Sequence, residues 1–272
     1  MLKKWTKTML FTATAALLLA AGTFTSCSDG DDDDDGGPLF EIEGGVLTKC
    51  NNDKIPRNGV VTIPDDVTSI GNNAFYHCTA LTSVTIHGSV TKIGDNAFYG
   101  CNALTSVTIH DGVTSISDHA FYYCSALTSV TIPGSVTSIG NNAFHGCIAL
   151  TSVTIPGSVT SIESDAFSLC SALTNVEIGN GVTSIESSAF ADCYKLVSVT
   201  IPDSVTEINT YAFNNCSALT SVTFADTKGW YATRTKGWPG DSIYVSDPNT
   251  NATNFKDDKG WLGKYLYKET AE

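Results

Sequence analysis

A repeat of 23 residues runs through most of the chain. Cysteine, phenylalanine and leucine each recur seven times at this step, with no insertion between the copies. The three columns are Cys78, Cys101, Cys124, Cys147, Cys170, Cys193 and Cys216; Phe75, Phe98, Phe121, Phe144, Phe167, Phe190 and Phe213; and Leu81, Leu104, Leu127, Leu150, Leu173, Leu196 and Leu219. A unit this short cannot bury its own apolar side chains, so the repeat predicts a solenoid in which each coil packs on its neighbours.

Each unit contains two kinds of local pattern. The sequence Ser-Val-Thr-Ile, as at 83–86, alternates apolar and polar residues and predicts a short strand. Equivalent strands of adjacent coils should pair in parallel at ~4.8 Å. The segment 71–78 predicts a helical turn with Ala74, Phe75 and Cys78 facing inward. The predicted fold class is a repeat solenoid of seven 23-residue coils with short parallel strands and helical turns, capped at both ends.

The two ends of the repeat region differ from its middle at 67–224. Residues 39–66 predict an N-terminal capping repeat, because Val61 and Ile63 keep the strand columns while Asn58 stands where leucine is expected. Residues 225–272 lose the period and gain aromatic residues, namely Trp230, Tyr231, Trp238, Tyr244, Phe255, Trp261, Tyr265 and Tyr267. We expect this segment to cap the apolar end of the last coil. The alternative is a small binding module, since Trp and Tyr are frequent interface anchors.

The first 26 residues have the pattern of a signal peptide. Lysines at positions 3, 4 and 7 precede an apolar stretch of 13 residues, Met9–Ala21, which is too short to span a ~30 Å hydrocarbon core. The segment Phe24–Cys27 is similar to a lipoprotein lipobox. This resemblance implies cleavage before Cys27 and a lipid on its sulfur that holds the protein in the outer membrane. The alternative is an ordinary secretory signal with an incidental Cys27.

Residues 27–38 predict an acidic, disordered tether, because Asp31–Asp35 is an uninterrupted run of aspartate with nothing apolar to bury. Such a run after the lipid-bearing cysteine resembles the export signal that sends lipoproteins of some Gram-negative anaerobes to the outer face of the outer membrane. The alternative is a plain acidic spacer. The expected location is therefore an outer-membrane lipoprotein that faces the cell exterior.

The averaged unit AFxxCxxLxSVxIPxSVxxIG covers residues 60–224 and resembles the BspA-like leucine-rich repeats of bacterial surface proteins. The resemblance implies a leucine-rich repeat solenoid, surface display, and adhesion or interaction with a host. It also implies a host or extracellular-matrix protein as partner, because binding of fibronectin and fibrinogen is reported for some members.

Charge and motifs narrow the function further. The chain has 15 Lys and Arg against 28 Asp and Glu, a net charge of −13, which disfavours nucleic acid as a partner. No Gly-x-Ser-x-Gly, His-Glu-x-x-His or Walker-type segment is present, so we expect no catalytic residues, no cofactor and no enzyme activity.

His87 and His110 share one column and suggest a metal pair, although two exposed turn residues explain them as well, and we expect no metal site. The column cysteines are expected to be buried free thiols, since stacked side chains point in parallel.

Candidate binding residues come from the variable positions of the repeat. The two residues before each column cysteine vary most, and Tyr76, Tyr99, Tyr122 and His145 predict an aromatic stripe over four coils. Such a stripe is suited to stacking on sugars or anchoring a protein, unless the rings merely cover the coil. The segments Asp203–Val205 and Asp241–Ile243 resemble bacterial O-glycosylation sequons, which makes Ser204 and Ser242 candidate sites.

Two functions remain open after this reading. The first is a lipid-anchored, non-catalytic adhesin or host-interaction protein on the cell surface. The second is a glycan-capturing or structural accessory protein of the cell envelope.

Overall fold

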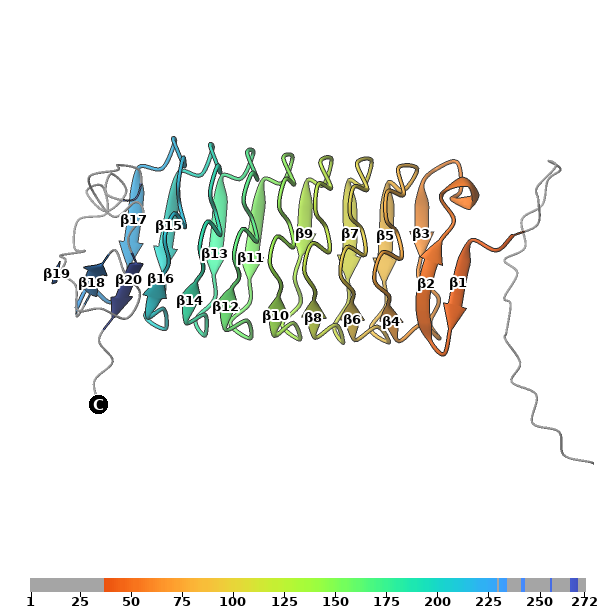
Figure 1. Ribbon diagram of the computed structural model, residues 1–272, viewed down its shortest axis with the longest axis horizontal. Helices are drawn as coiled ribbons and strands as arrows, with labels where there is room; N and C mark the ends of the chain where they lie inside the picture. Colours follow the sequence, from red (N-terminus) through yellow and green to blue (C-terminus); the bar gives the residue numbers. More distant parts are fainter. Residues whose placement is uncertain (1–36, 229, 234–240, 243–254, 256–264, 269–272) are drawn as a thin grey trace, which may run out of the picture. The chain divides into compact units, whose positions relative to one another are not determined.

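The 23-residue repeat folds into stacked coils, and each coil adds one strand to each of two sheets (Figure 1). The computed structural model describes residues 37–228, 230–233, 241–242, 255 and 265–268, all within the unit Gly36–Glu272. The predicted signal peptide, Cys27 and nearly all of the tether lie outside the described residues. Among the described residues, no helix has the length and hydrophobicity needed to cross a bilayer.

One strand of each coil lies in an eight-stranded parallel sheet. Adjacent strands pair residues that are one 23-residue repeat apart, so that Val84 pairs with Val107 and Thr85 with Thr108. Alternate residues face the core, as the pattern in the sequence predicts. In order along the chain, the strands are β3 (Val60–Thr62), β5 (Ser83–Ile86), β7 (Ser106–Ile109), β9 (Ser129–Thr131), β11 (Ser152–Ile155), β13 (Asn175–Ile178), β15 (Ser198–Ile201) and β17 (Ser221–Phe224).

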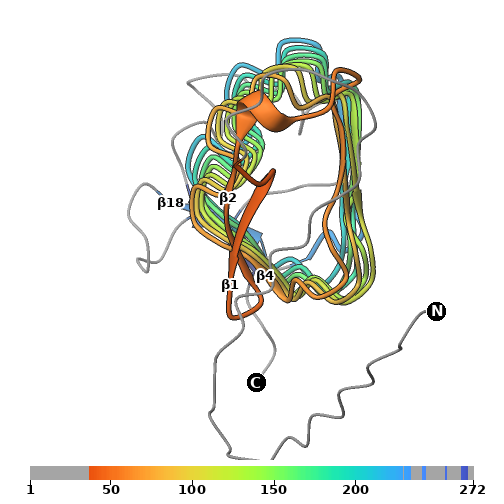
Figure 2. The ribbon, with the colours of Figure 1, turned by 90° about the vertical axis from the view of Figure 1, so that its right-hand side faces the viewer.

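A second strand of each coil belongs to a twelve-stranded sheet whose middle is parallel and whose ends are antiparallel. Its repeat strands are β2 (Val46–Cys50), β4 (Ser69–Ile70), β6 (Lys92–Ile93), β8 (Ser115–Ile116), β10 (Ser138–Ile139), β12 (Ser161–Ile162), β14 (Ser184–Ile185) and β16 (Glu207–Ile208). Its outer strands are β1 (Phe40–Glu43) at one end and β20 (Tyr265–Lys268), β18 (Trp230–Thr233) and β19 (Asp241–Ser242) at the other. Viewed along the stack, the coils superpose closely (Figure 2).

The predicted solenoid is confirmed, with eight coils rather than seven. The additional coil is the N-terminal segment, which keeps the 23-residue register on both sheets: Val46 pairs with Ser69, and Val60 with Ser83. The substitution of leucine by Asn58 therefore does not prevent this segment from stacking on the next coil.

Phenylalanine rings form a continuous stack through the core. The rings of the Phe75–Phe213 column are fully buried, and successive centroids lie 4.6 to 5.5 Å apart with nearly parallel planes. At the two ends, Phe40 and Phe255 meet the stack edge-on at 6.1 and 5.1 Å. The two end rings of the stack, Phe75 and Phe213, are thus covered by aromatic residues from outside the regular repeats.

The cysteine column is buried and its thiols are free. Cys50 is also a buried free thiol, but it lies outside the 23-residue register, and its backbone carbonyl accepts a hydrogen bond from the thiol of Cys78. The thiol of Cys101 donates a hydrogen bond of 3.0 Å to the carbonyl of Phe75 in the preceding coil, and Cys124 does the same to Phe98 at 3.1 Å. Burial raises the pKa of the Cys124 thiol well above its ordinary value and raises that of Cys170 to about 12. These cysteines are therefore neutral donors that link coils, and not nucleophiles.

The segment predicted as a helical turn is built differently. In the segment 71–78, every second N–H closes a tight turn within its own coil, as in the 3.0 Å bond from Tyr76 to the carbonyl of Asn73. The alternate N–H groups point to the next coil, as in the 2.7 Å bond from Phe75 to Ala97. The turns thus make a third wall that is hydrogen-bonded from coil to coil, and no helix forms in it.

Left-handed residues explain why the chain turns repeatedly instead of winding a helix. Two positions in each turn segment have φ between 54° and 71°. They are Asn73, Asn96, His119, Asn142, Asp165, Ser188 and Tyr211 in one column, and His77, Gly100, Tyr123, Gly146, Leu169, Asp192 and Asn215 in the other. A right-handed helix cannot continue through such residues. We name the seven segments 71–79, 94–102, 117–125, 140–148, 163–171, 186–194 and 209–217 the turn wall.

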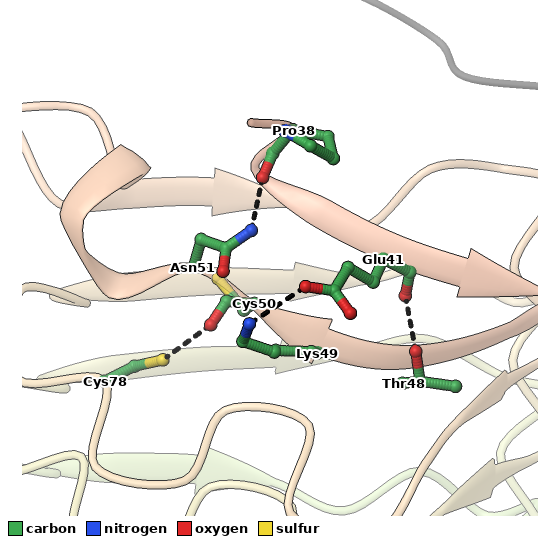
Figure 3. Close-up of polar contacts among 7 residues, drawn as sticks. All are labelled: Pro38, Glu41, Thr48, Lys49, Cys50, Asn51 and Cys78. Atoms are coloured by element: carbon green, nitrogen blue, oxygen red, sulfur yellow. Dashed lines mark hydrogen bonds and ion pairs between the residues drawn. The ribbon is translucent and has the colours of Figure 1, made fainter. Parts of the chain in front are cut away.

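The N-terminal end is held by a small set of polar contacts (Figure 3). Strand β1 lies antiparallel to β2, where Lys49 forms a 2.9 Å ion pair with Glu41 and Thr48 donates to the backbone carbonyl of Glu41. The side-chain amide of Asn51 donates to the carbonyl of Pro38. After β2, the short 3₁₀ helix η1 (Asn52–Lys54) leads the chain toward β3.

At the other end, Trp230 is buried and meets the ring of Phe224 edge-on at 4.9 Å. Strand β20 pairs with β16, and Lys268 forms a 2.8 Å ion pair with Asp226. These described residues pack against the last coil.

Phe121→Ala should lower the free energy of unfolding by about 3–5 kcal/mol, because it empties a fully buried position between two stacked rings. Guanidinium titration followed by circular dichroism measures the effect. Thr131→Ala on the exposed face of β9 is the control and should change stability by less than about 0.5 kcal/mol. Equal midpoints for Phe121→Ala and the parent chain would contradict a core that depends on the ring stack.

Tyr211→Asn should raise the melting temperature, because Tyr211 has φ 61° and asparagine tolerates this conformation better. The expected gain in unfolding free energy is up to about 1 kcal/mol. Tyr194→Asn is the matched control, since Tyr194 is similarly exposed without a positive φ. A gain of the same size in both variants would show that side-chain exposure, and not backbone conformation, is responsible.

Candidate functional site: an aromatic patch on the turn wall

The four residues of the predicted stripe project outward from the turn wall. Each follows a buried phenylalanine, and the tight turns place the two neighbours on opposite sides of the chain. Phe75 is fully buried, for example, whereas Tyr76 is 49% exposed. Tyr99, Tyr122 and His145 are partly buried along the same line.

The structure brings the four rings into one stack. Centroids lie 5.1 Å apart between Tyr76 and Tyr99, and 4.8 Å apart between Tyr99 and Tyr122 and between Tyr122 and His145. The planes differ by 7° to 21°. Because each ring covers the face of the next, the stack offers mainly ring edges and phenol hydroxyls to solvent. Sugar stacking, which needs an open ring face, is therefore disfavoured along most of the stripe.

Three further rings flank the stack. His77 meets Tyr76 edge-on at 4.6 Å, Tyr123 meets Tyr122 edge-on at 4.7 Å, and the ring of His119 lies 5.3 Å from that of Tyr122. We name these seven residues the aromatic patch. They are Tyr76, His77, Tyr99, His119, Tyr122, Tyr123 and His145.

Two glycines make room for the flanking rings. A Cβ built on Gly100 would lie 2.6 Å from the ring of His77, and one on Gly146 would lie 2.8 Å from the ring of Tyr123. Each ring therefore lies over the glycine of the following coil. The column His77, Gly100, Tyr123 and Gly146 thus alternates a ring with a glycine. This alternation is the sequence signal for a second row of rings, His77 and Tyr123, which the predicted stripe does not include.

Two neighbouring rings of the patch, Tyr122 and His145, have pKa values shifted toward the uncharged form. Burial lowers the pKa of His145, an effect that His119 reinforces and Asp165 opposes. Burial also raises the pKa of Tyr122, and the neighbouring Tyr123 and Tyr99 act in the same direction. The Nδ1 atom of His145 is buried and has no hydrogen-bond partner among the described residues.

The other candidate residues do not form a comparable site. The rings of His87 and His110 stack at 5.9 Å, and His87 Nε2 lies 3.6 Å from the carboxylate of Asp65. No group of three metal-binding side chains occurs among the residues that the structure describes. Ser204 already donates to the carbonyl of Val182 at 2.8 Å and accepts from the N–H of Gly181 at 3.0 Å. Ser242 lies in β19, and the structure does not describe its side chain.

Comparison with known proteins identifies the repeat. Six copies of the model for the BspA type leucine rich repeat region match residues 54–171 and 137–229, which together cover more than half of the chain. The chain belongs to the BspA-type leucine-rich repeat family. Family membership agrees with the repeat columns and with the solenoid described above.

Several solved structures resemble this BspA-type chain. A leucine-rich cell surface protein of Faecalibacterium prausnitzii is 33% identical with a TM-score of 0.63, over 78% of this chain and 62% of that protein. The leucine-rich repeat protein of T. pallidum is 26% identical with a TM-score of 0.45, over 58% of this chain and 88% of that one. A leucine-rich repeat protein of Bacteroides ovatus is 25% identical with a TM-score of 0.36, over 69% of each chain. A search of curated proteins finds no match.

His145 should titrate below its ordinary pKa of 6.5 in an NMR titration of the imidazole ring. The unfolded chain then takes up a proton at higher pH than the folded chain, so His145 favours unfolding as the pH falls below 6.5. His145→Gln should flatten the loss of stability between about pH 7 and pH 5. The raised pKa of Asp165 acts in the opposite direction, in a lower pH window above 3.8. A midpoint of 6.5 or above for His145 would contradict the burial of its ring.

Proposed function

We propose that this BspA-type repeat protein is displayed on the cell surface and binds a protein partner through the aromatic patch, without catalysis. The observation that carries the proposal is the patch itself, a continuous set of seven rings on four consecutive coils. Tyrosine is among the residues most enriched at the centres of protein interfaces. A rigid scaffold also keeps the rings in place before binding, which lowers the entropic cost of association.

Surface display is supported by the similarity to the cell surface protein of Faecalibacterium prausnitzii. We extend the proposal to the lipoprotein reading of the N-terminus, in which a lipid on Cys27 anchors the protein in the outer membrane and the acidic tether holds the solenoid away from it. The adhesive partner is then a host or matrix protein of the fibronectin or fibrinogen kind. Absence of enzyme activity is consistent with a fold that serves as an interaction scaffold.

Glycan capture is the second candidate, and a different surface favours it. The outward residues of the eight-stranded sheet are exposed Ser and Thr in most coils, such as Ser106 and Thr108 on β7. Glu177 interrupts these columns and accepts a hydrogen bond of 3.1 Å from Thr154. A polar face with few charges is suited to neutral sugars, whereas the stacked patch is suited to protein.

The triple variant Tyr76→Ser, Tyr99→Ser and Tyr122→Ser should lose at least about tenfold in affinity for immobilised fibronectin or fibrinogen, because it removes the centre of the patch. Solid-phase binding with the mature, unlipidated chain measures the effect, and circular dichroism confirms that the solenoid persists.

Tyr211→Ser is the control, since this tyrosine is equally exposed, lies outside the patch and contacts none of the wall carboxylates in the described residues. Unchanged binding by the folded triple variant would reject the patch as the binding surface. Binding to a glycan array with no binding to either matrix protein would favour the second candidate.

A further inference from the structure

The outward side chains of the turn wall change from mainly aromatic to acidic after the coil that carries His145. Aromatic rings occupy its outer positions up to His145, and carboxylates follow in the next two coils at Glu163, Asp165, Glu186 and Asp192. Asp95 and Asp118 lie on the same wall beside the rings. The N–H groups of Asn142 and Gly146, on either side of His145, donate to the carbonyls of Ser164 and Ser168 in the next coil, so the aromatic and acidic parts adjoin.

The turn wall carries no cation of its own. The seven turn-wall segments contain no Lys or Arg, and residues 67–224 as a whole contain only Lys92 and Lys195 against ten acidic residues. None of the six wall carboxylates forms an ion pair with Lys or Arg among the residues that the structure describes. The negative charge is thus left for a partner.

Several of these carboxylates are held in fixed positions by the neighbouring coil. Asp192 accepts a 2.8 Å hydrogen bond from the amide of Asn215 and a 3.1 Å bond from the hydroxyl of Tyr194. Asp118 accepts a 2.7 Å bond from the N–H of Asn141, and Asp95 accepts from the amide of Asn72. Both Asp165 and Asp192 occupy left-handed backbone positions. Fixed carboxylates lose little freedom when a partner binds, and they accept paired hydrogen bonds from guanidinium groups.

We propose that the partner segment recognised by the aromatic patch is basic: an extended polypeptide whose Arg or Lys side chains reach the carboxylates of the turn wall while its apolar side chains contact the rings. This inference rests on the proposed function, because it assigns the charge of the partner to the same surface. Arginine fits best, since its planar group pairs with carboxylates in two-point contacts and also packs well against aromatic rings. Sulfated glycans and nucleic acids would be repelled by the wall.

Two synthetic peptides of equal length test the charge. One alternates Arg with Leu and Ser, and the other has Glu in place of every Arg. Fluorescence anisotropy with the full mature chain should show binding of the arginine peptide alone, and the affinity should fall as salt is raised. Equal binding of both peptides, or no binding of the arginine peptide, would overturn the inference.

Matched variants locate the site. Glu163→Gln, Asp165→Asn, Glu186→Gln and Asp192→Asn together should weaken binding of the arginine peptide by about tenfold or more. The control neutralises four carboxylates off the turn wall with Asp65→Asn, Asp66→Asn, Asp111→Asn and Asp203→Asn, which changes net charge equally and should change affinity by less than about threefold. Asparagine is compatible with the left-handed positions, so both variants should fold, and circular dichroism checks this. Equal losses in both variants would mean that net charge alone attracts the peptide, which would also overturn the inference.

The same variants separate this inference from the proposed function. If matrix-protein binding requires the three tyrosines but survives neutralisation of the wall, the basic partner is wrong and the aromatic site stands. If the arginine peptide depends on the wall while the tyrosine variant keeps full matrix binding, the proposed function is wrong and the acidic wall stands.

Discussion

Hydrogen bonding between equivalent residues of neighbouring coils is the interaction on which the whole structure depends. It operates on both sheets and on the turn wall, always at the same step along the sequence. Threonine side chains add to it at the corners: the hydroxyl of Thr114 donates to the carbonyl of Thr91 at 3.0 Å, and Thr105 does so to Thr82. An inserted residue in one coil would disturb the pairing of that coil with its neighbours on both sheets and on the turn wall, which favours copies of one length.

The fixed register also determines what each side chain contacts. A residue in one coil meets the equivalent residue of the next, so phenylalanine stacks on phenylalanine in the core and tyrosine on tyrosine at the surface. The same rule lets each column cysteine from Cys101 onward reach the phenylalanine carbonyl of the preceding coil. The aromatic patch is thus a consequence of the scaffold: substituting rings in one column suffices to create a stacked row, without any change in the backbone.

The strands and the core could be predicted from sequence because they depend on side-chain columns, which the repeat displays directly. The turn wall could not, because inward-facing Ala74, Phe75 and Cys78 satisfy a helical turn and a series of tight turns equally well. The difference lies in backbone dihedral angles. Asparagine at positions 73, 96 and 142 was a signal for left-handed conformation, but His119 and Tyr211 in the same column carry no such signal.

The candidate site shows a similar limit. The stripe through Tyr76 and Tyr99 follows from the column alone, whereas the second row depends on His77 and Tyr123 leaning over the glycines of the next coil. The two rings fit there because the glycines of the next coil have no side chain to block them. The list of residues in one column does not show which neighbour each ring will lean over. The relation between two adjacent coils is needed.

The turn wall is suited to recognition because its cohesion comes mostly from the backbone. On the sheets, inward side chains are fixed by the core, and the corners use threonine to join coils. On the turn wall, the N–H groups of alternate residues make the contacts between coils, so the side chains at the three outward positions contribute less to stacking. These positions are 73, 76 and 77 and their equivalents in later coils. They hold tyrosine, histidine, glycine, leucine, serine, alanine, asparagine and aspartate in different coils, while the neighbouring Phe and Cys columns do not vary. A surface that tolerates such variation on a fixed backbone can place rings and carboxylates side by side at little cost to folding.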